Sequence, residues 1–199
     1  MCVPGLKIVS PASPAEAFGL IAGAIRDDDP VLVFEHKALY GRKEEVLDRE
    51  HVLPLGRART LRAGRDLTLV GLSITVGICL AAADELAGQG VSAEVIDLRT
   101  LVPLDAAAVL GSVGRTGRLV VVEENPGQLG WGASVAAIAA QEAFGSLSAP
   151  VTRVSGGNVP LPVAASLEAE VDVTAARVVA AAQAVLGHGR QRSGITEQK

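Results

Sequence analysis

Residues 67–97 read LTLVGLSITVGICLAAADELAGQGVSAEVID, and this stretch decides the fold class. Two near-continuous apolar runs, Leu67–Gly71 and Ala93–Asp97, flank the Ala-rich segment Thr75–Ala87, which has a helical period. Strands that are apolar on both faces are typical of a parallel sheet covered by helices on each side. The stretch therefore predicts a β-α-β unit with parallel strands.

The same alternation continues on both sides of this unit. Short apolar runs predict further strands and Ala-rich segments predict further helices: strands at Lys7–Ser10, Val31–Phe34, Leu119–Val122 and Val151–Val154, and helices at Pro14–Arg26, Asp105–Gly114, Trp131–Phe144 and Thr174–Leu186. Ser13 is typical of a helix N-cap, and glycine is typical just past a helix end, as at Gly117 and Gly187. We expect an α/β fold with a doubly wound, mostly parallel sheet.

Two segments depart from this alternation. Residues 36–65 are polar and rich in Gly, Arg, Glu and Lys; they predict one short strand at Arg57–Leu61 and a linker at residues 41–50. The last segment, residues 188–199, is polar and has no period, which predicts a flexible tail.

The composition excludes several classes of protein. Hydrophobic residues are 49% and charged residues 20%, which excludes a disordered chain. The net charge of −4 argues against a nucleic-acid partner. The apolar stretches are interrupted well short of the roughly 20 residues of a membrane span, and the N-terminus lacks a signal-peptide pattern. Cys2 and Cys79 are too few for a disulfide framework, so a cytoplasmic location is expected.

The glycine-rich turns do not match a nucleotide-binding motif. A dinucleotide site needs G-x-G-x-x-G directly after a strand, but Gly127, Gly130 and Gly132 are spaced G-x-x-G-x-G. A serine hydrolase would need G-x-S-x-G around Ser73, and Thr75 breaks that pattern. Ser73 is predicted instead to cap the helix that follows it.

Polar residues follow two of the predicted strands. Glu35 and His36 end the strand at Val31–Phe34, where they could act in catalysis, although a supporting or interface role is favoured. Glu123 and Glu124 follow another strand and could bind a cation or face a channel. The favoured alternative is that Glu123 pairs with a neighbouring Arg and Glu124 is solvated. These residues do not form a complete catalytic constellation.

A series of longer motifs is shared with one known family. The motifs occur in this order: PGLKIV at residues 4–9, AIRDDDPV at 24–31, FEHKALYG at 34–41, LPLGRA at 53–58, GRDLTLV at 64–70, AEVIDLRTLVPLD at 93–105 and RLVVVEE at 118–124. The series resembles the second half of the β subunit of thiamine-diphosphate-dependent 2-oxo acid dehydrogenases, the E1 component, of the pyruvate or acetoin type. The resemblance covers nearly the whole chain.

The resemblance implies a division into domains. Residues 1–40 would be a β-α-β remnant of a pyrimidine-binding domain, residues 41–50 a linker, residues 51–187 a transketolase C-terminal-type domain, and residues 188–199 the tail. The Glu that activates the cofactor would lie upstream of Met1, and the diphosphate and Mg²⁺ site would lie on the α subunit. We therefore expect no catalytic or thiamine-diphosphate-binding residue on this chain, and no activity when it is alone.

The resemblance also implies a function and partners. The assembled enzyme would decarboxylate pyruvate or a similar 2-oxo acid and transfer the acyl group to lipoyl. This chain would contribute assembly, closure of the active-site channel and docking of the dihydrolipoyl acyltransferase core. Its partners would be an E1 α subunit or a pyrimidine-binding half, and a second copy of itself. The alternatives are a non-catalytic assembly module, half of a split thiamine-diphosphate enzyme, and a small-ligand-binding Rossmann-like protein.

Two further expectations concern the N-terminal 40 residues. By resemblance, Ala24, Ile25, Asp27 and Asp29 would supply oxygen ligands to a structural K⁺ ion, a hard cation suited to a helix C-terminus. The strand at Lys7–Ser10 or the strand at Val31–Phe34 should also present an unpaired apolar edge. We therefore expect a homodimer or a hetero-complex.

Overall fold

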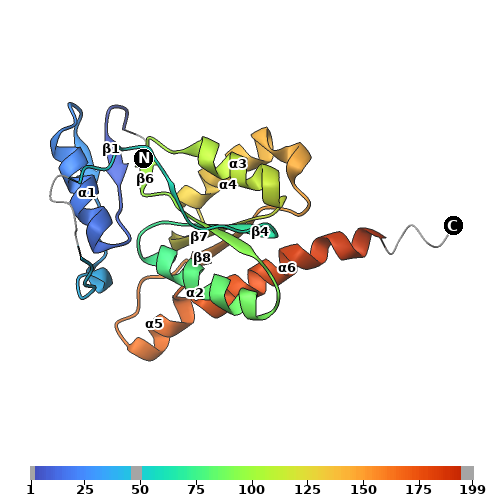
Figure 1. Ribbon diagram of the computed structural model, residues 1–199. Helices are drawn as coiled ribbons and strands as arrows, with labels where there is room; N and C mark the ends of the chain where they lie inside the picture. Colours follow the sequence, from blue (N-terminus) through green and yellow to red (C-terminus); the bar gives the residue numbers. More distant parts are fainter. Residues whose placement is uncertain (1–2, 46–50, 194–199) are drawn as a thin grey trace.

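The computed structural model describes residues 3–45 and 51–193, the last five of them by backbone alone. Its main sheet has five strands in the order β3-β5-β4-β7-β8 (Figure 1). The strands are β3 (Arg59–Arg62), β4 (Leu67–Gly71), β5 (Ala93–Asp97), β7 (Leu119–Pro126) and β8 (Thr152–Gly156). The pairing of β4 with β5 is parallel, with Leu67 opposite Ala93, and only β3 runs antiparallel to its neighbour. The predicted parallel unit is confirmed.

Helices cover both faces of this sheet, as in a doubly wound fold (Figure 1). One face packs against α2 (Ile74–Gly88) and α6 (Ala175–Ser193), and the other packs against α3 (Ala106–Thr116) and α4 (Trp131–Glu142). Successive side chains of a strand point to opposite faces, so Leu69 lies in the first core and Val70 in the second. Both residues are fully buried, which explains why the strands are apolar without alternation.

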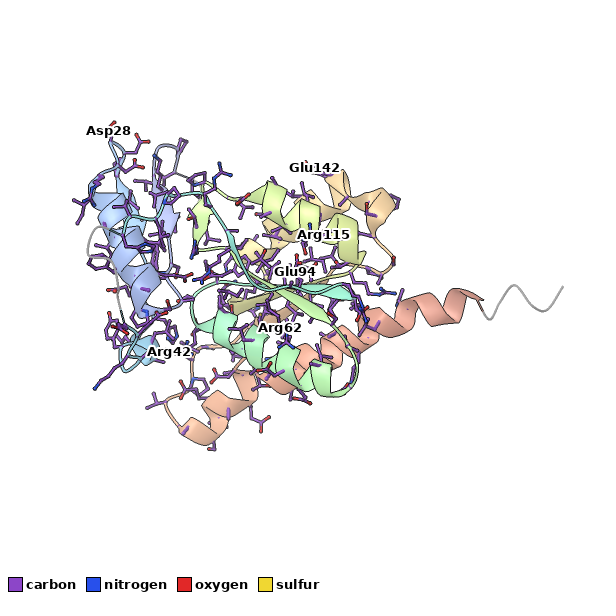
Figure 2. The ribbon with its side chains drawn as sticks, in the orientation of Figure 1. Asp28, Arg42, Arg62, Glu94, Arg115 and Glu142 are labelled. Carbon is purple, nitrogen blue, oxygen red and sulfur yellow. The ribbon has the colours of Figure 1, made fainter. Side chains whose placement is uncertain are left out.

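Ion pairs fasten the helices to the sheet. Arg115 of α3 donates to the largely buried carboxylate of Glu94 in β5 at 2.7 Å (Figure 2). On the opposite face, Arg62 of β3 pairs with Asp84 of α2. None of the helices within residues 3–45 and 51–193 is long and apolar enough to cross a bilayer.

A second, three-stranded sheet contains strands from both the N-terminal segment and the main domain. It has the order β2-β1-β6 and contains β1 (Lys7–Val9), β2 (Val31–Val33) and β6 (Thr100–Val102). The crossover between β1 and β2 is α1 (Pro14–Ile25), and the short helix η1 (Lys37–Leu39) follows β2. Because β6 follows directly after β5, this sheet attaches the N-terminal segment to the main domain (Figure 1).

Of the two strands that were candidates for an unpaired edge, β2 has one among the described residues and β1 does not. The β1 strand pairs with β2 on one side and with the antiparallel β6 on the other, so its edge is covered within the chain. The β2 strand pairs only with β1 in the described residues. Beside its open edge, Leu32 and Phe34 are 42% and 57% exposed.

Two of the helix ends predicted from local sequence signals are confirmed. The Ser13 hydroxyl accepts from the backbone of Glu16 at 3.4 Å, and Gly117 ends α3 with φ +68°, both as predicted. The prediction that Gly187 ends the last helix is wrong, because α6 continues to Ser193 and takes in the start of the predicted tail. The following Arg and Gln residues are good helix formers. Residues 194–199 of that tail, and residues 46–50 of the predicted linker, lie outside the described residues.

Four short elements were not predicted: β6, the helices η1 and η2 (Phe144–Ser146), and α5 (Ala165–Val171). Each spans seven residues or fewer, so none repeats a periodic pattern often enough to be recognised from sequence.

Candidate functional site

A cleft opens at the carboxyl ends of β4 and β7, the two strands between which the order of the sheet reverses direction. Its volume is about 500 Å³. The main domain contributes Leu72 and Ser73 after β4, and Glu124 and Asn125 at the end of β7, while the N-terminal segment contributes residues 34–36. The cleft therefore lies where the two parts of the chain meet.

His36 and Glu124 join the two walls of this cleft. The imidazole Nε2 lies 2.8 Å from Glu124 Oε1, and Nδ1 accepts from the backbone N–H of Ala38 at 3.2 Å. An imidazole that accepts at Nδ1 carries its proton on Nε2, so Nε2 donates to the carboxylate. Neither nitrogen remains to take a proton from a substrate. The pair therefore acts as a contact between the two parts, and Glu124 is engaged rather than simply solvated.

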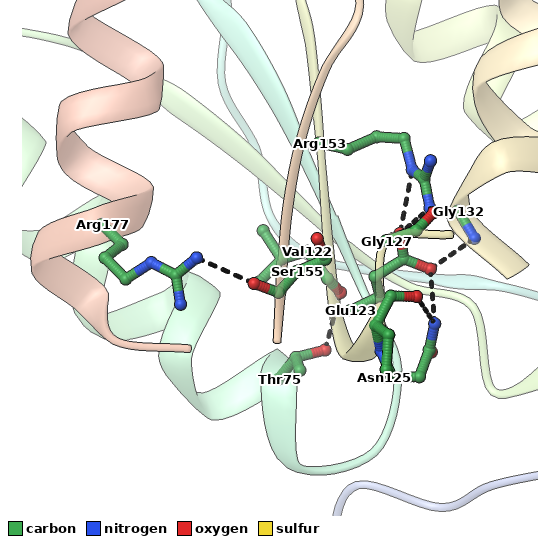
Figure 3. A network of polar contacts seen from close by, with 10 residues as sticks. Thr75, Val122, Glu123, Asn125, Gly127, Gly132, Arg153, Ser155 and Arg177 are labelled. Carbon is green, nitrogen blue, oxygen red and sulfur yellow. Dashed lines mark hydrogen bonds and ion pairs between the residues drawn. The ribbon is translucent and has the colours of Figure 1, made fainter. Parts of the chain in front are cut away.

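Ser73 adopts an unusual backbone conformation, with φ +53° and ψ −125°. The predicted capping role is wrong, because its hydroxyl makes no bond to the helix and is buried without a hydrogen-bond partner in the described residues. Thr75 organises this turn instead: its Oγ1 accepts from the backbone N–H of Leu72 at 3.0 Å and lies 3.0 Å from the carbonyl oxygen of Val122 (Figure 3). Although the strand-turn-helix geometry resembles that of a hydrolase nucleophile, His36 is not available as its base.

Glu123 occupies the centre of a polar network beneath the cleft (Figure 3). Its fully buried carboxylate accepts from Nε of Arg153 at 2.8 Å and also from the Nη2 of that residue. The other carboxylate oxygen accepts from the backbone N–H of Gly132 at 2.8 Å and from the amide of Asn125 at 3.1 Å. This geometry agrees with the favoured expectation that Glu123 pairs with a neighbouring Arg.

The glycine-rich turn is shaped around this carboxylate. A Cβ atom on Gly130 would lie 2.4 Å from Glu123 Oε2, and one on Gly132 would lie 2.7 Å from Glu123 Oε1. The first turn of α4 therefore binds a carboxylate from within the chain at the place where a dinucleotide fold would bind a phosphate. The glycines of the G-x-x-G-x-G turn leave space for the Glu123 carboxylate, which occupies the turn, so the turn does not fit a diphosphate.

A second buried ionic cluster connects α1 to β5. Glu16 of α1 accepts from Nε of Arg99 at 2.8 Å, and Nη2 of Arg99 lies 2.8 Å from the same carboxylate oxygen. Asp97 lies beside them with one carboxylate oxygen unpartnered among the described residues. Burial and the charge of Glu16 raise the pKa of Asp97 well above its ordinary value. Burial opposes the ionisation of Glu16, but the neighbouring Asp97, the positive charge of Arg99 and the hydrogen bonds from Arg99 and the backbone of Ala12 outweigh it and lower the pKa of Glu16.

Sequence reasoning missed this cluster. Only the position of Asp97, a carboxylate at the end of a buried strand, could have indicated it. Glu16 and Arg99 are 83 positions apart and share no motif, so their pairing could not be recognised from sequence.

The residues expected to hold K⁺ lie at the end of α1. The Lys7 ammonium lies 2.7 Å from Asp27 Oδ1 and 3.1 Å from Asp29 Oδ2. These carboxylates raise the pKa of Lys7, and the hydrogen bond from Lys7 lowers the pKa of Asp27. The carbonyl oxygen of Ala24 already accepts from two backbone N–H groups. In this arrangement the residues do not form an open oxygen cage, so the K⁺ site stays a prediction.

Within residues 3–45 and 51–193, no three His, Cys, Asp or Glu side chains come together in a way that could hold a metal ion. At the Glu123 turn the described residues do not fit the diphosphate of thiamine diphosphate, because the carboxylate already fills that turn.

Comparison with known proteins places this architecture in a family. The model of the transketolase C-terminal domain matches residues 56–178, and that of the transketolase pyrimidine-binding domain matches residues 1–43. A solved split-gene transketolase, described as an inactive beta4 tetramer, superposes with a TM-score of 0.79 at 29% identity, covering 95% of this chain and 60% of that one.

Relatives in sequence are β subunits. Pyruvate dehydrogenase E1 component subunit beta is 44% identical in Dictyostelium discoideum, covering 92% of this chain and 52% of that protein, and 46% identical in Rhizobium meliloti, covering 92% and 40%. Acetoin:2,6-dichlorophenolindophenol oxidoreductase subunit beta of Cupriavidus necator is 42% identical, covering 94% and 56%. The chain thus spans about half the length of these relatives. It belongs to the transketolase C-terminal domain family, and its homologues are the β subunits of pyruvate and acetoin dehydrogenases.

Proposed function

We propose that this chain forms part of the β subunit of a thiamine-diphosphate-dependent 2-oxo acid dehydrogenase. The observation that carries the proposal is the order of the two domain matches, pyrimidine-binding and then C-terminal, in a chain 42–46% identical to such β subunits over more than 90% of its length. The assembled enzyme would decarboxylate pyruvate or a similar 2-oxo acid and transfer the acyl group to lipoyl.

The share of this chain in that reaction would be structural. It would close the active-site channel, hold the subunits together and dock the dihydrolipoyl acyltransferase core. Thiamine diphosphate and Mg²⁺ would be held by an E1 α subunit and a pyrimidine-binding half. In support, the turn at Gly130 and Gly132 is filled by Glu123. A reducing compartment such as the cytoplasm would keep the buried thiol of Cys79 free.

A second candidate is half of a split thiamine-diphosphate enzyme, or a non-catalytic assembly module. The similarity to a split-gene transketolase, whose solved tetramer is described as inactive, favours this alternative. Partner chains would restore turnover to part of a β subunit or to half of a split enzyme, but not to an assembly module.

Reconstitution distinguishes them. The chain alone, supplied with thiamine diphosphate, Mg²⁺ and pyruvate, should give no decarboxylation above background. Adding an E1 α subunit and a pyrimidine-binding half should produce a complex on gel filtration and dye-coupled turnover of pyruvate or acetoin. A complex without turnover would support the assembly module. Turnover by the chain alone, or no complex at all, would contradict the main proposal.

The K⁺ site is proposed as part of the same subunit. It would require Lys7 to share Asp27 and Asp29 with the ion. A rise in melting temperature that saturates with KCl at constant ionic strength, and is lost in Asp27→Asn, would support it. Equal stability in KCl and choline chloride would contradict it.

A further inference from the structure

The cleft between the N-terminal segment and the main domain carries charge of one sign. Glu35 and Glu124 line it, and its described lining includes neither Lys nor Arg. His36 also lines it, but donates its Nε2 proton to Glu124. The Glu35 carboxylate has one long contact, 3.5 Å, from the hydroxyl of Tyr40. Carboxylate oxygens in this cleft therefore retain unused capacity to accept hydrogen bonds, and an anionic ligand would be repelled.

The rest of the wall is apolar and aromatic. Trp131 at the start of α4, Phe34 beyond β2 and Leu101 in β6 line the same space. An aromatic ring attracts a cation placed over its face and also accepts an apolar stem. Carboxylates combined with aromatic rings favour a ligand that has both a positive charge and an apolar body.

An unmet hydrogen-bonding group independently indicates a ligand. Ser73 lines the cleft, is only 8% exposed, and its Oγ has no hydrogen-bond partner in the described part of the chain. Buried hydroxyl groups without a partner are rare, and one at a cleft is expected where a ligand completes the bonding. The hydroxyl can accept from an N–H group, as a cationic nitrogen would require.

We propose that this cleft binds an organic cation, a primary ammonium or guanidinium group on an apolar stem. Glu35 and Glu124 neutralise the charge, Trp131 and Phe34 enclose the stem, and Ser73 accepts a hydrogen bond. The cation is either a free amine or a Lys or Arg side chain of another polypeptide. This inference does not depend on the proposed enzymatic function.

Three probes of equal size test the charge requirement on the purified chain. Benzylamine should bind saturably in calorimetry or in NMR titration with the Trp131 indole signal as reporter, whereas benzyl alcohol and benzoate should bind at least about fivefold more weakly, since an ion pair of this exposure is worth roughly that factor. Equal binding of the neutral or the anionic probe would overturn the proposal.

Variants test the residues. Glu35→Gln and Glu124→Gln should each weaken benzylamine binding about fivefold, and Ser73→Ala should weaken it as well. Glu142→Gln, on the exposed surface of α4, is the matched control and should leave binding unchanged (Figure 2). Among the described residues Glu35→Gln removes no hydrogen bond or ion pair shorter than 3.5 Å, so it is the variant least able to act through misfolding. Unaltered binding in both Glu variants would overturn the proposal.

A further arm identifies the source of the cation. If Nα-acetyl-lysine amide or Nα-acetyl-arginine amide binds more tightly than benzylamine, the ligand is a side chain of a polypeptide. If benzylamine binds more tightly, it is a free amine.

Discussion

Nε of Arg99 donates a hydrogen bond of 2.8 Å to Oε1 of Glu16, Nη2 lies 2.8 Å from the same oxygen, and this ion pair joins the turn after β5 to helix α1. Both residues are more than nine-tenths buried, so water could not solvate either charge if its partner were removed. The pair therefore holds the N-terminal segment on the main domain, and with it one wall of the cleft.

Replacing Arg99 should destabilise the chain strongly. Arg99→Met leaves Glu16 buried with Arg59 as its nearest remaining cation, at 3.7 Å, and we expect a loss of about 3–5 kcal/mol in the free energy of unfolding. Urea denaturation measures this loss. Arg65→Met is the matched control: its side chain is 85% exposed, 3.9 Å from Asp66, and should change stability by about 0–1 kcal/mol. Equal effects of the two variants would show that the buried pair does not hold the segment.

Asp97 should make stability depend on pH. Its pKa is raised in the folded chain by burial and by the charge of Glu16, so folding favours its protonated form. The resulting stabilisation is complete below the ordinary pKa of an Asp and is lost as the pH rises toward the folded value. Asp97→Asn retains a neutral hydrogen-bond donor and should flatten this decline in urea denaturation between pH 5 and pH 9. An unchanged slope would exclude Asp97 as its cause.

Gly132 should not tolerate a side chain. In Gly132→Ala the added Cβ would lie 2.7 Å from the buried carboxylate of Glu123, so the Arg153 pair must shift, at a cost of about 1–3 kcal/mol. Gly111→Ala in α3 is the matched control, because its Cβ would meet only Arg115, at an ordinary 3.8 Å, and should stabilise the helix by about 0.5–1 kcal/mol. Thermal unfolding should separate the two variants in sign; a stabilised Gly132→Ala would disprove the packing argument.

The open edge of β2 should promote association. Leu32 and Phe34 are exposed beside a strand whose outer backbone groups have no strand partner in the described residues. We expect a homodimer or larger assembly in light scattering at micromolar concentration, and Leu32→Lys should lower the measured mass by opposing edge-to-edge pairing. A monodisperse mass of one chain for the unmodified protein would contradict this expectation.

The sheet illustrates what could be predicted without coordinates. Leu67–Gly71 and Ala93–Asp97 are near-continuous apolar runs because both of their faces are buried, and this requirement appears in the residues themselves. The caps at Ser13 and Gly117 are equally local, since each depends on residues within one helical turn. The pairing of Glu123 with an Arg was expected as well, because a carboxylate at the end of a buried strand needs a partner.

Contacts between residues far apart in the sequence could be identified only from the tertiary structure. The covering of β1 by β6, the meeting of Glu16 with Arg99, and the contact between His36 and Glu124 each join positions more than 80 residues apart. The left-handed backbone of Ser73 likewise depends on Thr75 reaching a neighbouring strand at Val122. Short-range patterns report the local backbone and the burial of each strand, which suffices for the fold class. The cleft and its charge arise only when distant segments pack together, because the free energy of those contacts depends on the geometry of the whole chain.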